Sequence, residues 1–155
     1  MIVNLNAVQT LQSEWHDVVR MRDRIQNLVV STFAFDAKKS PIFGDILYNL
    51  PFLLALDVLK QVLLLAREDG RFTGSRTQLD DLMDSAKTSL SWIDWQYLRE
   101  GVKRRDEVAH HGKLFGDLQC LQYIAHIEAQ LLAWRIIAAF EPHIPASPMS
   151  FRSGS

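Results

Sequence analysis

The sequence has 155 residues, of which 48% are hydrophobic and 23% are charged, and its formal net charge at pH 7 is -1. These proportions exclude a disordered or fibrous chain, and the small net charge excludes attraction to nucleic acid by a positive field around the whole molecule. The length predicts a single domain. We place this domain at residues 1–141 and expect residues 142–155 to form a flexible tail rich in proline and serine.

Three features indicate a cytoplasmic protein without a membrane partner. The single cysteine, Cys120, excludes an internal disulfide and is typical of a reducing compartment. The opening residues, MIVNLNAVQT, lack the basic, apolar and cleavage-site segments of a signal peptide. The most apolar run, LPFLLALDVLKQVLLLA, is interrupted by Asp57, Lys60 and Gln61 and falls short of the roughly 20 apolar residues that cross a bilayer.

The first predicted helix runs from about Asn6 to Val30. Apolar residues recur there at steps of three, four and seven, a spacing that places them on one buried stripe of a helix. The stripe consists of Val8, Leu11, Trp15, Val18, Ile25 and Val29. The following segment, DAKKSPIFGD, contains proline and glycine and therefore predicts a loop.

A second helix is predicted to begin after Asn49, which has the side chain of a helix cap, and to end near Arg67. Its apolar residues occupy most of the circumference of the helix, so we expect it to be the most buried helix. The glycine-containing segment EDGRFTGSR ends it. Thr77 and Asp80 then resemble a capping box, which predicts a short third helix to about Leu90.

Two further helices complete the predicted fold. Ser91 and Asp94 again have capping-box spacing, which predicts a fourth helix over 92–111. Asp117 is expected to cap a fifth helix over about 118–140. No segment shows the alternation of a strand. The predicted fold class is therefore all-α, an up-down bundle of four main helices plus a short helix.

The stretch RRDEVAHHGK, residues 104–113, closes the predicted fourth helix. The apolar residues of that helix define the stripe expected to face the core: Trp95, Leu98, Val102 and Ala109. At about 100° per residue, three polar residues flank this stripe: Arg105, Asp106 and His110. Three others are expected on the solvent side: Arg104, Glu107 and His111.

Arg105 and His110 together offer a catalytic chemistry. An arginine held by packing can clamp a phosphate with two parallel hydrogen bonds, and a histidine can take or give a proton near neutral pH. Asp106, four residues before His110, can orient its imidazole. These groups provide much of what RNA cleavage by ribose 2′-OH attack requires. The alternative is a solvated helix end in which Arg105 pairs with acids of the same helix.

Residues around the pair have supporting assignments. Glu100 is a candidate supporting acid, although it also has the spacing to pair with Arg104. A basic rim that could bind RNA consists of Arg99, Lys103, Arg104, His111 and Lys113, and a plain solvated surface is the alternative. Asp106 with His110 has chelating spacing, but no third ligand is evident, so we expect no metal and no other cofactor.

This arrangement resembles the HEPN family and its R-x4-6-H motif. The motif runs here from Arg105 to His110, before Gly112, at the end of the penultimate long helix. The resemblance implies a homodimer whose motifs converge on one cleft, and metal-independent endoribonuclease activity that leaves a 2′,3′-cyclic phosphate. Arg105 would bind the phosphate, and His110 would act as the acid or base or would position the 2′-OH. Asp106 occupies the position of the motif at which asparagine is most common in the family.

The resemblance also has implications for partners. Many HEPN domains are toxins of toxin-antitoxin or other defence systems, which implies RNA as substrate and a protein antitoxin as a further partner. Gly112 stands where one branch of the family has a tyrosine, so modification of such a tyrosine is not expected here. The alternative function is a non-catalytic HEPN-like module that binds nucleotides or another protein.

Overall fold

The computed structural model describes residues 2, 4–35, 46–112 and 114–138. Within these residues the chain forms five α-helices and no strand, so the predicted all-α class is confirmed. The helices are α1 (Leu5–Phe35), α3 (Asn49–Glu68), α4 (Leu79–Ala86), α5 (Trp95–His111) and α6 (Asp117–Ala133). The predicted loop over 36–45, the tail over 142–155 and Lys113 lie outside the described residues.

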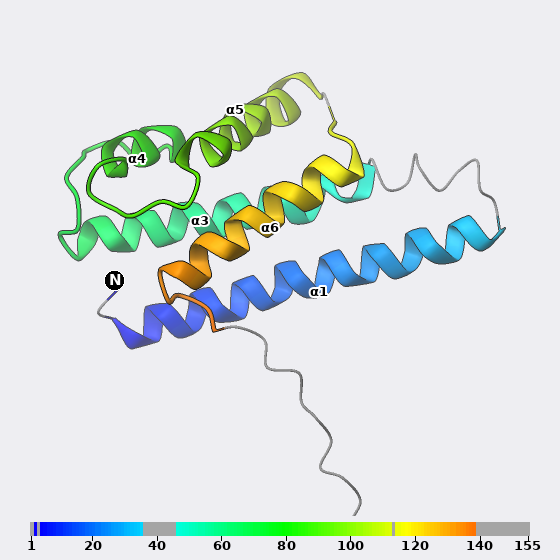
Figure 1. The fold of residues 1–155 in the computed structure, drawn as a ribbon, viewed down its shortest axis with the longest axis horizontal. Helices are drawn as coiled ribbons and strands as arrows, with labels where there is room; N and C mark the ends of the chain where they lie inside the picture. The colour runs from blue at the N-terminus through cyan, green and yellow to red at the C-terminus, as the bar shows by residue number, and fades with distance from the viewer. Residues whose placement is uncertain (1, 3, 36–45, 113, 139–155) are drawn as a thin grey trace, which may run out of the picture.

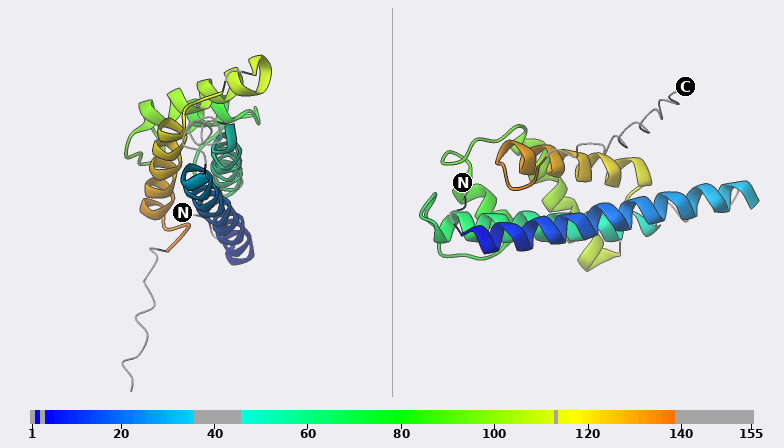
Figure 2. Two further views of the ribbon diagram at one scale, coloured as in Figure 1. Left: turned by 90° about the vertical axis from the view of Figure 1, so that its right-hand side faces the viewer. Right: turned by 90° about the horizontal axis from the view of Figure 1, so that it is seen from below.

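The helix α3 lies at the centre of the fold and packs against α1, α4 and α6 (Figure 1). The helix α5 rests on α4 and α6, and the C-terminal end of α1 extends beyond its neighbours (Figures 1 and 2). By length and composition α3 could cross a membrane, with a mean hydropathy of 1.6. In this structure 56% of that apolar window is buried among the other helices.

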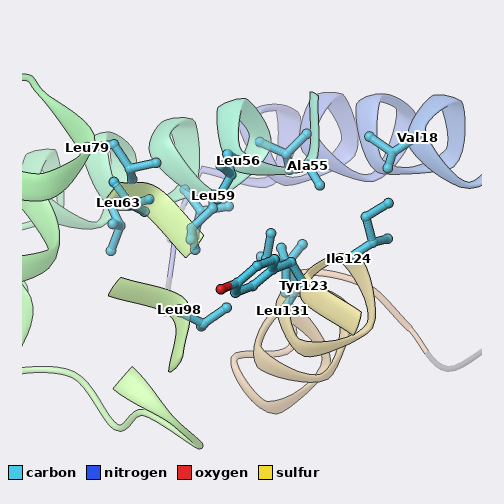
Figure 3. Packing of buried hydrophobic residues seen from close by; sticks show 14 of the residues in the cluster. Val18, Ala55, Leu56, Leu59, Leu63, Leu79, Leu98, Tyr123, Ile124 and Leu131 are labelled. Carbon is cyan, nitrogen blue, oxygen red and sulfur yellow. The ribbon is translucent and has the colours of Figure 1, made fainter. Parts of the chain in front are cut away.

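The hydrophobic core joins all five described helices. Val18 of α1, Leu79 of α4 and Leu98 of α5 point toward a common interior with side chains of α3 and α6 (Figure 3). The α3 contribution includes side chains with no exposed surface: Phe52, Ala55, Leu59, Val62, Leu63 and Ala66. Burial of such side chains stabilises the fold by roughly 1.5–3 kcal/mol each for the larger ones.

The predicted caps of α3 and α4 are wrong, because neither helix has a side-chain cap. The side chain of Asn49 does not cap α3. It is buried and bonds to the backbone of Phe115, because a buried amide requires partners and that backbone supplies both a donor and an acceptor. The residue before α4 is Gln78, in extended conformation, and no side chain caps that helix, so Thr77 is not its cap.

The start of α5 is also later than predicted. Asp94 is the cap, and its Oδ1 accepts a hydrogen bond from the Tyr97 amide at 2.9 Å. The Ser91 carbonyl accepts instead from the Gln130 side chain at 3.1 Å and from Trp134 Nε1 at 2.7 Å. Residues 91–94 are therefore held against the end of α6 rather than wound into α5.

The two ends of α6 differ from the prediction. Gly116 precedes the helix and Asp117 is its first residue, so Asp117 is not the cap. At the other end the helix stops at Ala133, and Arg135 adopts a left-handed conformation with φ 57°. The Ile136 amide then donates to the Leu131 carbonyl at 2.9 Å, a bond pattern that closes helices. The C-terminal end of α6 could not be predicted from the sequence, because arginine occupies the left-handed position where glycine is usual.

The contact between α5 and α6 depends on Gly101. A Cβ atom at this position would lie 2.8 Å from Cδ1 of Tyr123, closer than carbon atoms pack, so only glycine allows this approach. The Tyr123 ring also stacks on Tyr97 and Phe52, with centroid distances of 4.8 and 5.4 Å. The buried face of α5 is therefore turned toward Gly101. Leu98 and Val102 of the predicted stripe are buried, as predicted. Gly101 was not part of that stripe, because glycine has no side chain to add to it.

The substitution Gly101→Ala tests this close approach. We expect it to lower the free energy of unfolding by about 1–3 kcal/mol, because the clash outweighs the gain of up to about 1 kcal/mol in helix propensity. Urea denaturation measures the change. In a Tyr123→Leu background, which removes the ring, the same substitution should cost nothing. Equal or higher stability of Gly101→Ala alone would show that the helices do not approach this closely.

Candidate functional site

The Arg105 guanidinium is held beside α5 by its neighbour in the chain. Its Nε and Nη2 atoms donate to Oδ1 of Asp106 at 3.1 and 2.7 Å. The Arg105 side chain is 24% exposed, against 45% for Asp106, because Arg105 lies on the flank of α5 that turns toward the core. The side chain is therefore largely packed, and its two hydrogen bonds to Asp106 hold the guanidinium in one orientation.

His110 lies in the last turn of α5 and is exposed. Among the described residues it makes no hydrogen bond or ion pair, so Asp106 does not hold its imidazole as the spacing had suggested. Five residues correspond to about 140° of rotation and 7.5 Å of rise along a helix. Arg105 and His110 thus share one end of α5 but lie on different flanks, and a single chain does not bring them into contact.

Glu100 is engaged by Arg104 rather than by Arg105. The Arg104 Nε atom donates to Glu100 Oε1 at 2.9 Å, and this bond raises the pKa of the Arg104 guanidinium. The same guanidinium lies 5.5 Å from the centre of the Phe115 ring. The Arg104 side chain therefore lies against the surface of the protein. The sequence had predicted that it would face solvent. Glu107 is half-buried, again unlike the prediction, whereas His111 is exposed as expected.

The basic rim is partly occupied by carboxylates of the same chain. Arg99 donates to both oxygens of Asp84, at 3.0 and 3.3 Å, and lies 3.9 Å from Asp80. The hydrogen bond to Asp84 raises the pKa of Arg99, and the pair joins α5 to α4. Lys103 is exposed. Because such surface pairs contribute only about 0–1 kcal/mol, a phosphate could displace the carboxylates.

Asn49 and Phe115, which the sequence interpretation missed, hold the segment that follows the motif. Gly112 ends α5 in a left-handed conformation, with φ 62°. Three residues later, the Phe115 amide donates to Asn49 Oδ1 at 3.1 Å, and Asn49 Nδ2 donates to the Phe115 carbonyl at 2.9 Å. The signal in the sequence was an asparagine entering an otherwise apolar helix. Such a residue can pair with a distant loop as well as cap its own helix.

Two hollows of the described surface lie away from Arg105 and His110. One, of about 300 Å³, lies between α1 and α3, and another, of about 390 Å³, is bordered by Asp94, Tyr97 and Glu100 at the start of α5. Neither is lined by Arg105 or His110. In the part of the chain that the structure describes, no group of three or more His, Cys, Asp or Glu side chains could hold a metal ion.

Comparison with known proteins adds no assignment to this geometry. No family model, curated protein or solved structure matches the chain. The residues at the end of α5 and the motif they form are therefore the features that indicate a function.

Replacing Asn49 tests how that end is held. Asn49→Ala leaves the amide and carbonyl of buried Phe115 without these partners, so we expect a loss of about 1–3 kcal/mol in the free energy of unfolding. Hydrogen exchange should also become faster at the Phe115 amide, while exchange in the middle of α3 follows global stability alone. Unchanged exchange at Phe115 would mean that these two bonds do not anchor the segment.

Proposed function

We propose that the chain is a HEPN-like, metal-independent endoribonuclease that acts as a homodimer in the cytoplasm, as part of a toxin-antitoxin or other defence system. The observation that carries the proposal is the guanidinium of Arg105, oriented by Asp106 near the surface, on the same helix end as the exposed imidazole of His110. RNA is the proposed substrate, and a protein antitoxin is the proposed regulator.

The proposed reaction is a transesterification at one phosphodiester link. The ribose 2′-oxygen attacks phosphorus, the new O2′–P bond forms, and the bond from phosphorus to the 5′-oxygen breaks. One proton leaves the 2′-OH and one joins the departing 5′-oxygen. Histidine is suited to both transfers near neutral pH, and an arginine stabilises the negative charge that develops on the phosphoryl oxygens. The products are a 2′,3′-cyclic phosphate and a 5′-hydroxyl.

A second copy is part of the proposal because one chain separates its own Arg105 and His110. Two motifs brought together would supply a pair of histidines, one to accept a proton and one to donate it. Leu114 and Leu118, which follow the motif, are 46% and 66% exposed. Apolar side chains exposed beside a polar site are typical of a surface that another protein covers. We assign them to contact with the second copy.

A non-catalytic module is the second candidate, and one observation favours it. Three arginines near the site donate to carboxylates of their own chain: Arg99 to Asp84, Arg104 to Glu100, and Arg105 to Asp106. These pairs reduce the local positive potential available to a polyanion. Such a module would bind a nucleotide or another protein without cleaving RNA.

RNA cleavage in the presence of EDTA separates the two candidates. Arg105→Ala and His110→Ala should each lower the cleavage rate of labelled RNA by about 100-fold or more, because each removes a group that acts in the transition state. His16→Ala, at an exposed position on α1, is the matched control and should cleave at nearly the unsubstituted rate. If the unsubstituted dimer leaves RNA intact, the enzyme proposal fails and the binding module is retained.

Asp106 offers a separate test of the phosphate site. Asp106→Asn removes the negative charge while keeping an oxygen that can accept from Arg105. We expect labelled RNA to bind several-fold more tightly, on the order of 1 kcal/mol, with a steeper dependence on salt. Fluorescence anisotropy over a series of salt concentrations measures both quantities. Weaker binding would mean that RNA does not compete with Asp106 for the guanidinium.

A further inference from the structure

A groove runs between α1 and α3, away from α5. Its volume is about 300 Å³, and α1 and α3 supply its two walls, packed side by side (Figure 2). The residues that line it are Glu14, Asp17, Val18, Leu54, Asp57, Val58 and Gln61. None of these residues belongs to the proposed ribonuclease site.

An apolar stripe on α3 leads into this groove. Ile46, Leu50 and Leu54 are 50%, 52% and 37% exposed, and Leu54 also lines the groove. Residues four apart on a helix lie one above the other, about 6 Å apart along the axis. Leu50 and Leu54 therefore form an exposed apolar stripe on α3, and Ile46 adds a third exposed apolar side chain just before the helix begins. Such a stripe is typical of a surface that packs against another helix.

Three carboxylates, those of Glu14, Asp17 and Asp57, line the same groove. Asp57 accepts from Gln61 at 3.1 Å, and Asp17 lies 3.8 Å from Arg20, with both of those side chains well exposed. The Oε2 atom of Glu14 is buried and has no hydrogen-bond partner among the described residues. A carboxylate oxygen shielded from water without a donor is costly. An ammonium or guanidinium group entering the groove would remove that cost.

We propose that the α1–α3 groove docks an amphipathic helix of a partner protein, with apolar residues along its first turns and lysine or arginine at the end that meets Glu14, Asp17 and Asp57. The surface from Ile46 to Gln61 comprises 16 residues, and 15 helical steps span about 23 Å, so about four turns of helix would cover it. The carboxylates favour a cationic protein segment over an anionic lipid surface or a nucleic acid.

Two labelled peptides test the charge match. Both are amphipathic helices of about four turns with leucines on one face; one has arginines and the other glutamates at the end of that face. The arginine peptide should raise its fluorescence anisotropy with the full chain, and the glutamate peptide should not. Asp57→Lys should weaken the arginine peptide by about tenfold and strengthen the glutamate peptide. Binding of neither peptide, or of both equally, overturns the proposal.

The apolar stripe has its own variant and control. Leu50→Glu should abolish peptide binding, whereas Ile93→Ser, at a position 59% exposed but distant in the chain, should not change it. Circular dichroism on heating checks that both variants remain folded. If Leu50→Glu instead abolishes self-association in sedimentation, or binding to phosphatidylserine vesicles, the groove belongs to a second copy or to a membrane and the proposal fails. None of these readouts depends on ribonuclease activity.

Discussion

The packing of the Tyr123 ring against Gly101 is the constraint on which the arrangement of the second half of the chain depends. No larger residue fits at 101, because a Cβ atom there would lie 2.8 Å from the ring. This contact brings α5 close to α6 and fixes the rotation of α5 about its own axis. That rotation turns Arg105 toward the packed side and leaves His110 in solvent. The position of the motif is thus a consequence of how two helices pack.

Hydrophobic periodicity in the sequence was enough to predict the all-α class and the approximate place of each described helix. It was not enough to predict the caps. Asn49, Thr77 and Ser91 each have a side chain suited to capping, yet tertiary contacts or the local backbone decide the outcome. Periodicity predicted the burial of Leu98 and Val102 in α5, but not the close contact at Gly101, a residue without a side chain.

The candidate site was predictable in outline and not in its electrostatics. The spacing of Arg105 and His110 could be found in the sequence, and both lie at the end of α5. The carboxylate that pairs with each arginine could not be predicted from the sequence. Arg99, for example, pairs with a residue 15 positions earlier in the chain. Asn49 and Phe115 are 66 residues apart, so their two bonds are also beyond a local interpretation. Long-range pairing of this kind becomes visible only when the helices are packed.

Two surfaces of the molecule therefore have different proposed roles. The end of α5 presents arginine and histidine to a phosphodiester, and the α1–α3 groove presents leucine and carboxylate to a cationic helix. Both roles are compatible with the small net charge of the chain, since neither requires a field around the whole molecule.

The chemical nature of the RNA ends produced in EDTA tests the central claim most directly. Attack by the 2′-OH, assisted by histidine and arginine alone, predicts fragments that end in a 2′,3′-cyclic phosphate and begin with a 5′-hydroxyl, as mass spectrometry would identify. Fragments with 3′-hydroxyl and 5′-phosphate ends, or RNA that remains whole, would contradict it.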